Sequence, residues 1–175
     1  ETLKENGFTL NSHSDTEVLL KSYIHYGKNV VNHLNGIFAF AIWDTNNNEI
    51  FLARDHFGVK PLFYTKIDET LVFSSEIKAL FQYPGVKKVL NEQSISELFG
   101  IGPAHTSGTT VFKNIYEIKP AHFGIFNKNG FNIKRYWKLK SEKHVDTFEE
   151  TCEKLKFLLN DAITRQLVSD MPLCT

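Results

Sequence analysis

The feature that most constrains the fold is the run at residues 54–64, RDHFGVKPLFY, which lies between strand-like stretches. It combines an Arg-Asp step that can form ion pairs with a glycine and a proline. Glycine permits a left-handed backbone and proline fixes its own φ, so the run predicts a shaped turn rather than a continuous strand. Strands are expected around it, at residues 36–44, 49–54, 62–65 and 71–73. Together they would form an antiparallel meander.

Helix and strand signals flank this region. Ser14-x-x-Glu17 has the pattern of a capping box, so a helix is expected from about residue 15 to 27, followed by a short helical turn at 29–34. Asn91 is a candidate N-cap for a helix that reaches about Phe99. Weaker signals predict a short helix through Gln82 and strands at 111–112, 122–127 and 131–139, with an Asn-Gly hairpin turn at 128–130.

The last part of the chain has a different character. After a polar linker at 141–145, Thr147-x-x-Glu150 offers a second capping box. Apolar residues then recur on one helical face, at Phe148, Cys152, Leu155, Leu159, Ala162 and Ile163. The change from aromatic strands to a long amphipathic helix predicts a domain boundary near residue 142.

Composition excludes several classes of protein. The chain has 20 basic and 20 acidic side chains and no block of like charge, which gives no argument for nucleic-acid binding. Its apolar runs fall well short of the roughly 20 residues that cross a bilayer, so no membrane span is expected. Two cysteines without a CxxC pattern favour a reducing cytoplasm, and the histidines lack a metal-ligand spacing. No metal site is therefore assigned.

Several motifs together resemble a known family. The stretch 34–80, with its RDxFGxKPL and SSEIKAL elements, is similar to the glutaminase domain of glutamine-hydrolysing asparagine synthetases, which are class II glutamine amidotransferases. The resemblance extends to SDTEV at 14–18 and SDMPLCT at 169–175. It implies an α+β fold, the four-layer αββα sandwich of two antiparallel sheets found in N-terminal-nucleophile hydrolases, incomplete here. Residues 1–141 would be the glutaminase domain without its N-terminal part, and 142–175 the linker and first helix of an ATP-pyrophosphatase-type α/β synthetase domain.

Asp15 is the residue to which we assign substrate binding. A carboxylate in the first turn of a helix is stabilised by the helix dipole and by free backbone amides, so it is expected to be ionised and able to pair with an ammonium group. By resemblance, the aspartate of the SDxEV motif binds the α-amino group of glutamine. The alternative is that Asp15 only supports the start of the helix.

Other charged residues are interpreted as structural. Arg54 and Asp55 are expected to hold the turn, while Gly58 and Pro61 set its backbone geometry. Glu76 is expected to satisfy backbone amides at the start of a short helix. No catalytic residue is assigned.

The groups that break and make bonds are expected outside this chain. The family uses an N-terminal cysteine as nucleophile, an Asn-Gly pair as oxyanion hole and an arginine for the glutamine carboxylate, and this chain begins with Glu1. Asn35-Gly36 does not match that pair. Cys152 and Cys174 are expected to be buried small residues rather than nucleophiles. The ATP-binding loop would follow Thr175, so Leu173 to Thr175 would only approach the nucleotide.

The resemblance implies the reaction of the parent protein. Glutamine would supply ammonia for the amidation of aspartate through β-aspartyl-AMP, made with ATP and magnesium, and a homodimer is compatible with this reading. The chain itself is expected to be inactive and to bind no cofactor. Two rivals stay open: an amide-forming synthetase with a different acceptor, and a non-catalytic amidotransferase-like module for interaction or storage.

Overall fold

The computed structural model describes residues 2–12, 14–102 and 106–167. The chain divides into two compact units, Glu1–Lys138 and Leu139–Thr175. The first unit holds both β-sheets and helices α1 to α4, and helix α5 lies in the second.

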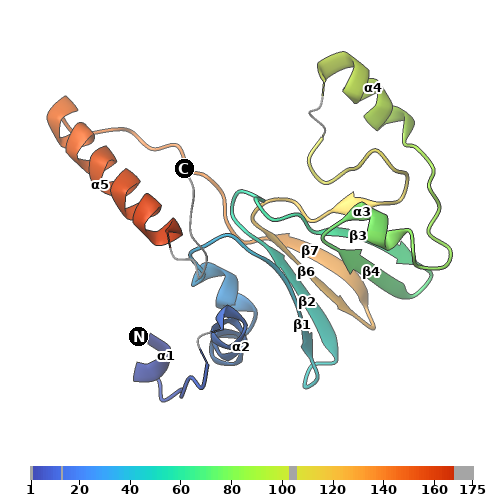
Figure 1. Cartoon of the computed structure of the whole chain (residues 1–175), viewed down its shortest axis with the longest axis horizontal. Coiled ribbons are helices and arrows are strands. Elements are labelled where there is room, and N and C mark those ends of the chain that lie inside the picture. The colour runs from blue at the N-terminus through green and yellow to red at the C-terminus, as the bar shows by residue number, and fades with distance from the viewer. Residues whose placement is uncertain (1, 13, 103–105, 168–175) are drawn as a thin grey trace. The chain divides into compact units, whose positions relative to one another are not determined.

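The first unit is built on two antiparallel sheets (Figure 1). The four-stranded sheet has the order β1-β2-β6-β7, and the three-stranded sheet has the order β4-β3-β5. Their bounds are β1 Ala39–Asp44, β2 Glu49–Arg54, β3 Phe63–Ile67, β4 Thr70–Ser74, β5 Tyr116–Glu117, β6 His122–Asn127 and β7 Gly130–Arg135. The predicted pair of antiparallel sheets is confirmed.

The predicted meander, in contrast, is wrong. β1 pairs with β2 and β3 pairs with β4, but β2 and β3 lie in different sheets. The second edge of β2 is taken by β6, and the second edge of β3 by β5, both much later in the chain. The loop between β2 and β3, which carries the RDHFGVKPL motif, therefore takes the chain from one sheet to the other.

Strand β2 lies between two apolar cores. Alternate residues of a strand point to opposite faces. Phe51 and Ala53 accordingly pack against Tyr23, Val30 and Val31 from the helical side. Leu52 belongs to the second core, which contains the buried residues Leu62, Leu71 and Ile118. Both faces of β2 are therefore covered, and the loop that follows Arg54 starts from a buried strand.

The helices largely follow the predictions. α2 (Asp15–Tyr26) and the 3-10 helix η1 (Gly27–Asn32) occupy the expected helix and turn, and Gly27 ends α2 with a φ of 57°. α4 (Glu92–Ile101) begins at the predicted N-cap Asn91, whose side chain accepts a hydrogen bond from the Gln93 N–H. α3 (Ile77–Leu80) is shorter than expected, and α1 (Thr2–Glu5) was not predicted.

Two strand predictions differ from the structure. β7 ends at Arg135 rather than near residue 139, because its partner strand β6 begins at His122, directly opposite Arg135. The strand expected at 111–112 is only an isolated bridge between Leu90 and Phe112. The edge position next to β3 is filled instead by β5.

The second unit contains helix α5 (Phe148–Gln166), which begins with the predicted capping box. Thr147 Oγ1 accepts from the Glu150 N–H, and Glu150 Oε2 accepts from the Thr147 N–H. None of the described residues of α5 is buried, and Cys152 is exposed. The expectation that Cys152 is buried is therefore wrong, because no described element of this unit covers its face; Cys174 lies outside the described residues. No described helix is long and apolar enough to cross a membrane.

Candidate functional site

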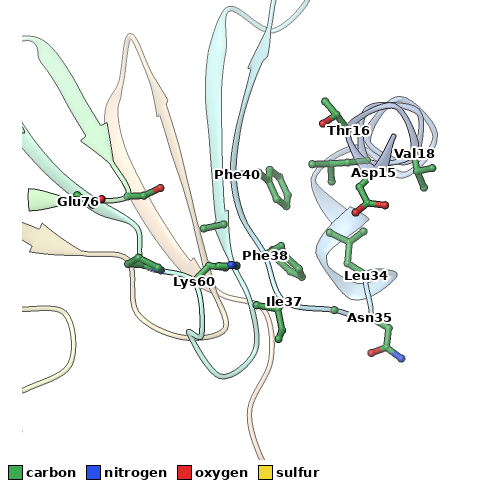
Figure 2. A pocket seen from close by; sticks show the side chains of 15 residues that line it. Asp15, Thr16, Val18, Leu34, Asn35, Ile37, Phe38, Phe40, Lys60 and Glu76 are labelled. Carbon is green, nitrogen blue, oxygen red and sulfur yellow. The ribbon is translucent and has the colours of Figure 1, made fainter. Parts of the chain in front are cut away.

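A cavity of about 830 Å³ opens beside the N-terminus of α2 (Figure 2). The first turns of α2 form one wall, the segment that enters β1 forms another, and the loops at 60–61 and 75–76 complete it. The lining residues are Asp15, Thr16, Val18, Leu19, residues 34–40, Lys60, Pro61, Ser75 and Glu76. A cavity of this size accommodates a small metabolite.

Asp15, the predicted substrate-binding residue, is the first residue of α2 and lies on the cavity wall. The side chain of the N-cap residue Ser14 accepts a hydrogen bond from the Thr16 N–H, at 3.2 Å. The Asp15 side chain is exposed, and its carboxylate has no hydrogen-bond or ion-pair partner among residues 2–12, 14–102 and 106–167. The cavity wall therefore carries a carboxylate that has no partner among the residues the structure describes.

The second carboxylate of this helical turn, Glu17, is used differently. The predicted capping box is not formed, because the Ser14 hydroxyl accepts from the Thr16 N–H rather than from the Glu17 N–H, and the Ser14 N–H donates to the Ser12 hydroxyl rather than to Glu17. The Glu17 carboxylate accepts instead from the backbone N–H groups of Asn11 and Ser12, from the Ser12 hydroxyl and from Lys21. These donors, with Lys21 the strongest, lower the pKa of Glu17 to about 2. The Glu17 carboxylate is therefore committed to the loop that precedes α2.

Apolar side chains face Asp15 across the cavity. Leu34, Phe38 and Phe40 are half-buried, and the two phenylalanine rings lie 5.5 Å apart. Figure 2 shows the Asp15 carboxylate projecting from α2 towards the side of Leu34 and Phe38. A carboxylate beside an apolar wall suits a ligand that carries an ammonium group on an aliphatic chain.

Arg54 ends β2 and ties the loop after it to the second sheet. Its Nε donates to the Lys60 carbonyl at 2.7 Å and its Nη2 to the Gly58 carbonyl at 2.8 Å. Its Nη1 donates to the Ile118 carbonyl at 2.6 Å and pairs with Glu117 at 3.0 Å. Arg54 itself is absent from the cavity lining and donates mainly to backbone carbonyls, which confirms its structural interpretation.

Asp55 holds the same loop from its donor side. Its carboxylate accepts from the backbone N–H groups of Phe57, Val59 and Lys60, each at 3.1 Å. Burial alone would raise the pKa of Asp55, but these N–H donors outweigh burial and lower the pKa. Asp55 is 2% exposed, so it is a structural anion rather than a group open to substrate.

The Arg54–Asp55 clamp delivers Lys60 to the cavity. Both backbone polar groups of Lys60 are held, the N–H by Asp55 and the carbonyl by Arg54. Its side chain lines the cavity and forms no ion pair with a described residue. Figure 2 shows Lys60 and Asp15 on different elements, on opposite sides of Phe38 and Phe40. Lys60 was not predicted as a site residue from the sequence, although its position within the RDHFGVKPL motif could have indicated it.

Glu76 also differs from its expected role. It is the N-cap residue of α3, but its side chain makes no capping hydrogen bond. Its carboxylate pairs with Lys78 at 2.5 Å and lines the cavity. The prediction that Glu76 satisfies backbone amides is therefore wrong. Asn35 and Gly36 lie on the lining too, and nothing in their geometry assigns them a catalytic role.

No group of described histidine, cysteine, aspartate and glutamate residues is arranged to hold a metal ion. The lining of the cavity contains no cysteine. The charged side chains on the lining, Asp15, Lys60 and Glu76, can bind and orient a small charged molecule.

Comparison with known proteins extends this description. The glutamine amidotransferase domain profile matches residues 1–137. The Bacillus subtilis (strain 168) protein asparagine synthetase [glutamine-hydrolyzing] 3 is 52% identical over 173 residues, covering 99% of this chain and 28% of that protein. Asparagine synthetase [glutamine-hydrolyzing] 2 of the same organism is 35% identical over 185 residues, covering 96% of this chain and 25% of that protein.

Among solved structures, the glutamine phosphoribosylpyrophosphate amidotransferase of B. subtilis complexed with ADP and GMP matches with a TM-score of 0.51 and 24% identity. The match covers 78% of this chain and 25% of that chain, and it bears on the fold alone. It confirms the predicted N-terminal-nucleophile hydrolase fold. The chain spans between 25% and 28% of the length of these three proteins.

Proposed function

Because the chain belongs to the glutamine amidotransferase domain family, we propose that it binds glutamine within a glutamine-hydrolysing asparagine synthetase. Glutamine and water give glutamate and ammonia, and the ammonia amidates aspartate through β-aspartyl-AMP elsewhere in the full-length protein. The similarity to the two B. subtilis asparagine synthetases supports this assignment. We also propose that the protein works in the cytoplasm, and a homodimer is compatible with this function.

The observation that carries the proposal is the unpartnered carboxylate of Asp15 at the cavity. The neighbouring side chains of Ser14 and Glu17 have other uses: Ser14 caps α2, and Glu17 holds the preceding loop. Asp15 alone in this group offers a charge to a ligand. An ammonium group bound there forms a charge-assisted hydrogen bond, while the aliphatic part of glutamine contacts Leu34, Phe38 and Phe40.

The described residues bind and orient glutamine rather than cleave it. Amide hydrolysis in this family requires a nucleophile, and no lining residue is a cysteine. Lys60 supplies a cation to the same cavity and suits a carboxylate of the bound amino acid. We assign Asp15 and Lys60 to binding and Arg54 and Asp55 to the architecture that holds Lys60.

ATP and magnesium belong to the proposed reaction of the full-length protein. The described residues do not fit them, since no acidic or histidine cluster could hold a metal ion. Residues 173–175, which the resemblance puts near the nucleotide, lie outside the described residues. No step in this chain is therefore assigned to ATP or magnesium.

The test is the Asp15→Asn substitution in the full-length protein. Loss of the charged hydrogen bond is expected to raise the KM for glutamine about ten- to hundredfold, because such bonds contribute about 1.5–3 kcal/mol. Asparagine formation with ammonium chloride in place of glutamine is expected to stay unchanged. Both rates are measured by asparagine production under saturating aspartate and ATP.

Asp68→Asn is the matched control. Asp68 is an exposed aspartate with a φ of 51° in the turn between β3 and β4, a conformation that asparagine tolerates well. The control should leave both rates unchanged. If Asp15→Asn also leaves the glutamine KM unchanged, Asp15 does not bind substrate and the proposed site is wrong.

The same assays separate the rivals. A synthetase with another acceptor would release ammonia from glutamine yet form no asparagine from aspartate. A non-catalytic module would show no glutamine hydrolysis in the full-length protein. Either outcome overturns the assignment as an asparagine synthetase, and the first would leave the glutamine site intact.

A further inference from the structure

The two carboxylates in the first turn of α2 have opposite surroundings. Asp15 has no partner among the described residues, whereas Glu17 is saturated. Glu17 accepts from the Asn11 N–H at 3.0 Å, from the Ser12 N–H at 2.7 Å and from the Ser12 hydroxyl at 2.6 Å. Asn11 and Ser12 precede α2, so these bonds hold the loop before the helix.

A chain of hydrogen bonds connects Glu17 to the residues on both sides of Asp15. The Ser12 hydroxyl donates to Glu17 and accepts from the Ser14 N–H at 3.2 Å. The Ser14 hydroxyl in turn accepts from the Thr16 N–H at 3.2 Å. The backbone that carries Asp15 is therefore fixed on its N-terminal side by Ser14 and on its C-terminal side by Thr16.

Lys21 strengthens the same arrangement one turn further along α2. Its ammonium group pairs with Glu17 at 2.6 Å and donates to the Thr9 carbonyl. The side chains of Lys21 and Glu17 are 20% and 18% exposed, so the pair is partly shielded from solvent. Together they hold both ends of the loop at 9–12 against α2.

We propose that Glu17 is a positioning residue of the glutamine site, which sets the direction of the Asp15 carboxylate through Ser12 and Ser14. The inference rests on the proposed function, in which Asp15 binds the ammonium group of glutamine. A site on a preformed turn avoids the cost of ordering that turn when ligand binds, and small misplacements of a binding group are expensive. Glu17 thereby influences glutamine affinity without touching glutamine.

The first test is Glu17→Gln in the full-length protein. Glutamine keeps the size of the side chain, but its NH2 group is a donor and cannot accept from the N–H groups of Asn11 and Ser12. The KM for glutamine is expected to rise roughly tenfold, since displacement of a binding group by about 1 Å costs up to a hundredfold. The kcat with glutamine and the ammonia-dependent rate should change less than about twofold, because Glu17 does not reach the reacting atoms.

Glu150→Gln is the matched control. Glu150 is the third residue of α5 and accepts a backbone hydrogen bond from its own N-cap, so the substitution weakens a genuine capping box at a residue that is not part of the cavity lining. It should leave the glutamine KM unchanged. A rise equal to that of Glu17→Gln would show a general effect of lost helix caps and would overturn the inference.

The second test combines Glu17→Gln with Asp15→Asn. If Glu17 acts through Asp15, Glu17→Gln should add less than about twofold to the KM of Asp15→Asn, so the two effects are strongly non-additive. Independent effects that multiply would overturn the inference and leave Asp15 as the binding residue. A null result for Asp15→Asn would overturn the proposed function and, with it, this inference.

Ser12→Ala serves where Glu17→Gln does not fold. It removes the hydroxyl that joins Glu17 to the Ser14 N–H and leaves the Glu17 charge in place. We expect a rise in the glutamine KM of about threefold, which is lost in the Asp15→Asn background. An unchanged KM in Ser12→Ala would contradict the hydrogen-bonded connection.

Discussion

The loop at residues 54–60 and the first turn of α2 both contain charged residues that lie close together in sequence, but the surroundings of these residues differ. In the loop, Arg54 and Asp55 are 7% and 2% exposed and their polar atoms bind the backbone of the chain. In the turn, Asp15 is exposed and its carboxylate has no partner among the described residues. The conspicuous motif is architectural, and the proposed binding charge lies in the turn.

The difference follows from what each segment must do. The loop carries the chain from one sheet to the other, so its backbone leaves both hydrogen-bond ladders and needs side chains to satisfy it. The turn is a helix start, whose N–H groups need only a cap from Ser14. The buried residues Arg54 and Asp55 therefore satisfy the backbone of the loop, whereas the start of α2 is capped by Ser14 and leaves Asp15 without a partner among the described residues.

The strongest test of this contrast is Arg54→Met. It would leave Glu117 buried without the Arg54 charge and would remove the donors to the carbonyls of Gly58 and Lys60, so we expect a loss of about 3–5 kcal/mol in the free energy of unfolding. Equilibrium unfolding in urea measures it.

The control for Arg54→Met is Arg165→Met, which breaks an exposed pair with Asp161 on α5 and should cause no measurable loss. A loss below about 1 kcal/mol for Arg54→Met would mean that the loop does not depend on its buried arginine. The contrast between loop and turn would then fail.

Gly58→Ala probes the backbone of the same loop. Gly58 has a φ of 68°, and an added Cβ would lie 2.7 Å from Pro120 Cγ and 3.0 Å from Arg54 Cζ. We expect a loss of about 1–3 kcal/mol, from strain and from displacement of the Arg54 guanidinium. Urea unfolding again gives the value.

Gly100→Ala is the matched substitution for Gly58→Ala. Gly100 lies inside α4 with no atom within 4 Å of an added Cβ, so alanine should stabilise the protein by about 0.5–1 kcal/mol. Losses of similar size at both positions would show that the loop at Gly58 carries no special constraint.

Acidification should weaken the hydrogen-bond network around Glu17. Hydrogen bonds and Lys21 lower the pKa of Glu17 from its usual 4.5 to about 2 in the folded protein. The stabilisation is therefore fully present above about pH 4.5 and is lost as the pH falls towards 2, and Glu17→Gln should flatten that part of the stability profile. Titration of the Glu17 carboxyl carbon by NMR measures the pKa, and a midpoint near 4.5 would contradict the network.

Local signals predicted most of the fold. The limits of β2 and β6 and the starts of α2, α4 and α5 follow from strand patterns and capping residues that lie in the element itself or next to it. The assignment of β2 and β3 to different sheets could not be read in this way. It depends on pairing with β6 and β5, which are distant in sequence, and a hairpin pattern looks the same in either sheet.

The site was predictable only in part. Asp15 was identified because the SDTEV motif marks it, and its role as a glutamine ligand stays a prediction. The pattern Ser14-x-x-Glu17 also predicted a capping box, yet Glu17 bonds Asn11 and Ser12, since the geometry of the preceding loop decides which N–H groups reach the carboxylate. Lys60 escaped notice because its place at the cavity depends on how Arg54 and Asp55 fold the loop.

The smallest expected effect concerns Lys60, which belongs to the loop at residues 54–60 and also lines the cavity beside the first turn of α2. Its backbone belongs to the Arg54–Asp55 clamp and its exposed side chain lines the cavity, so Lys60→Met should leave the free energy of unfolding unchanged and raise the KM for glutamine about threefold. Lys128→Met, in the exposed turn between β6 and β7, should change neither quantity. If Lys60→Met instead destabilises the fold without altering the KM, the loop serves architecture alone and the binding charge of this cavity rests on Asp15.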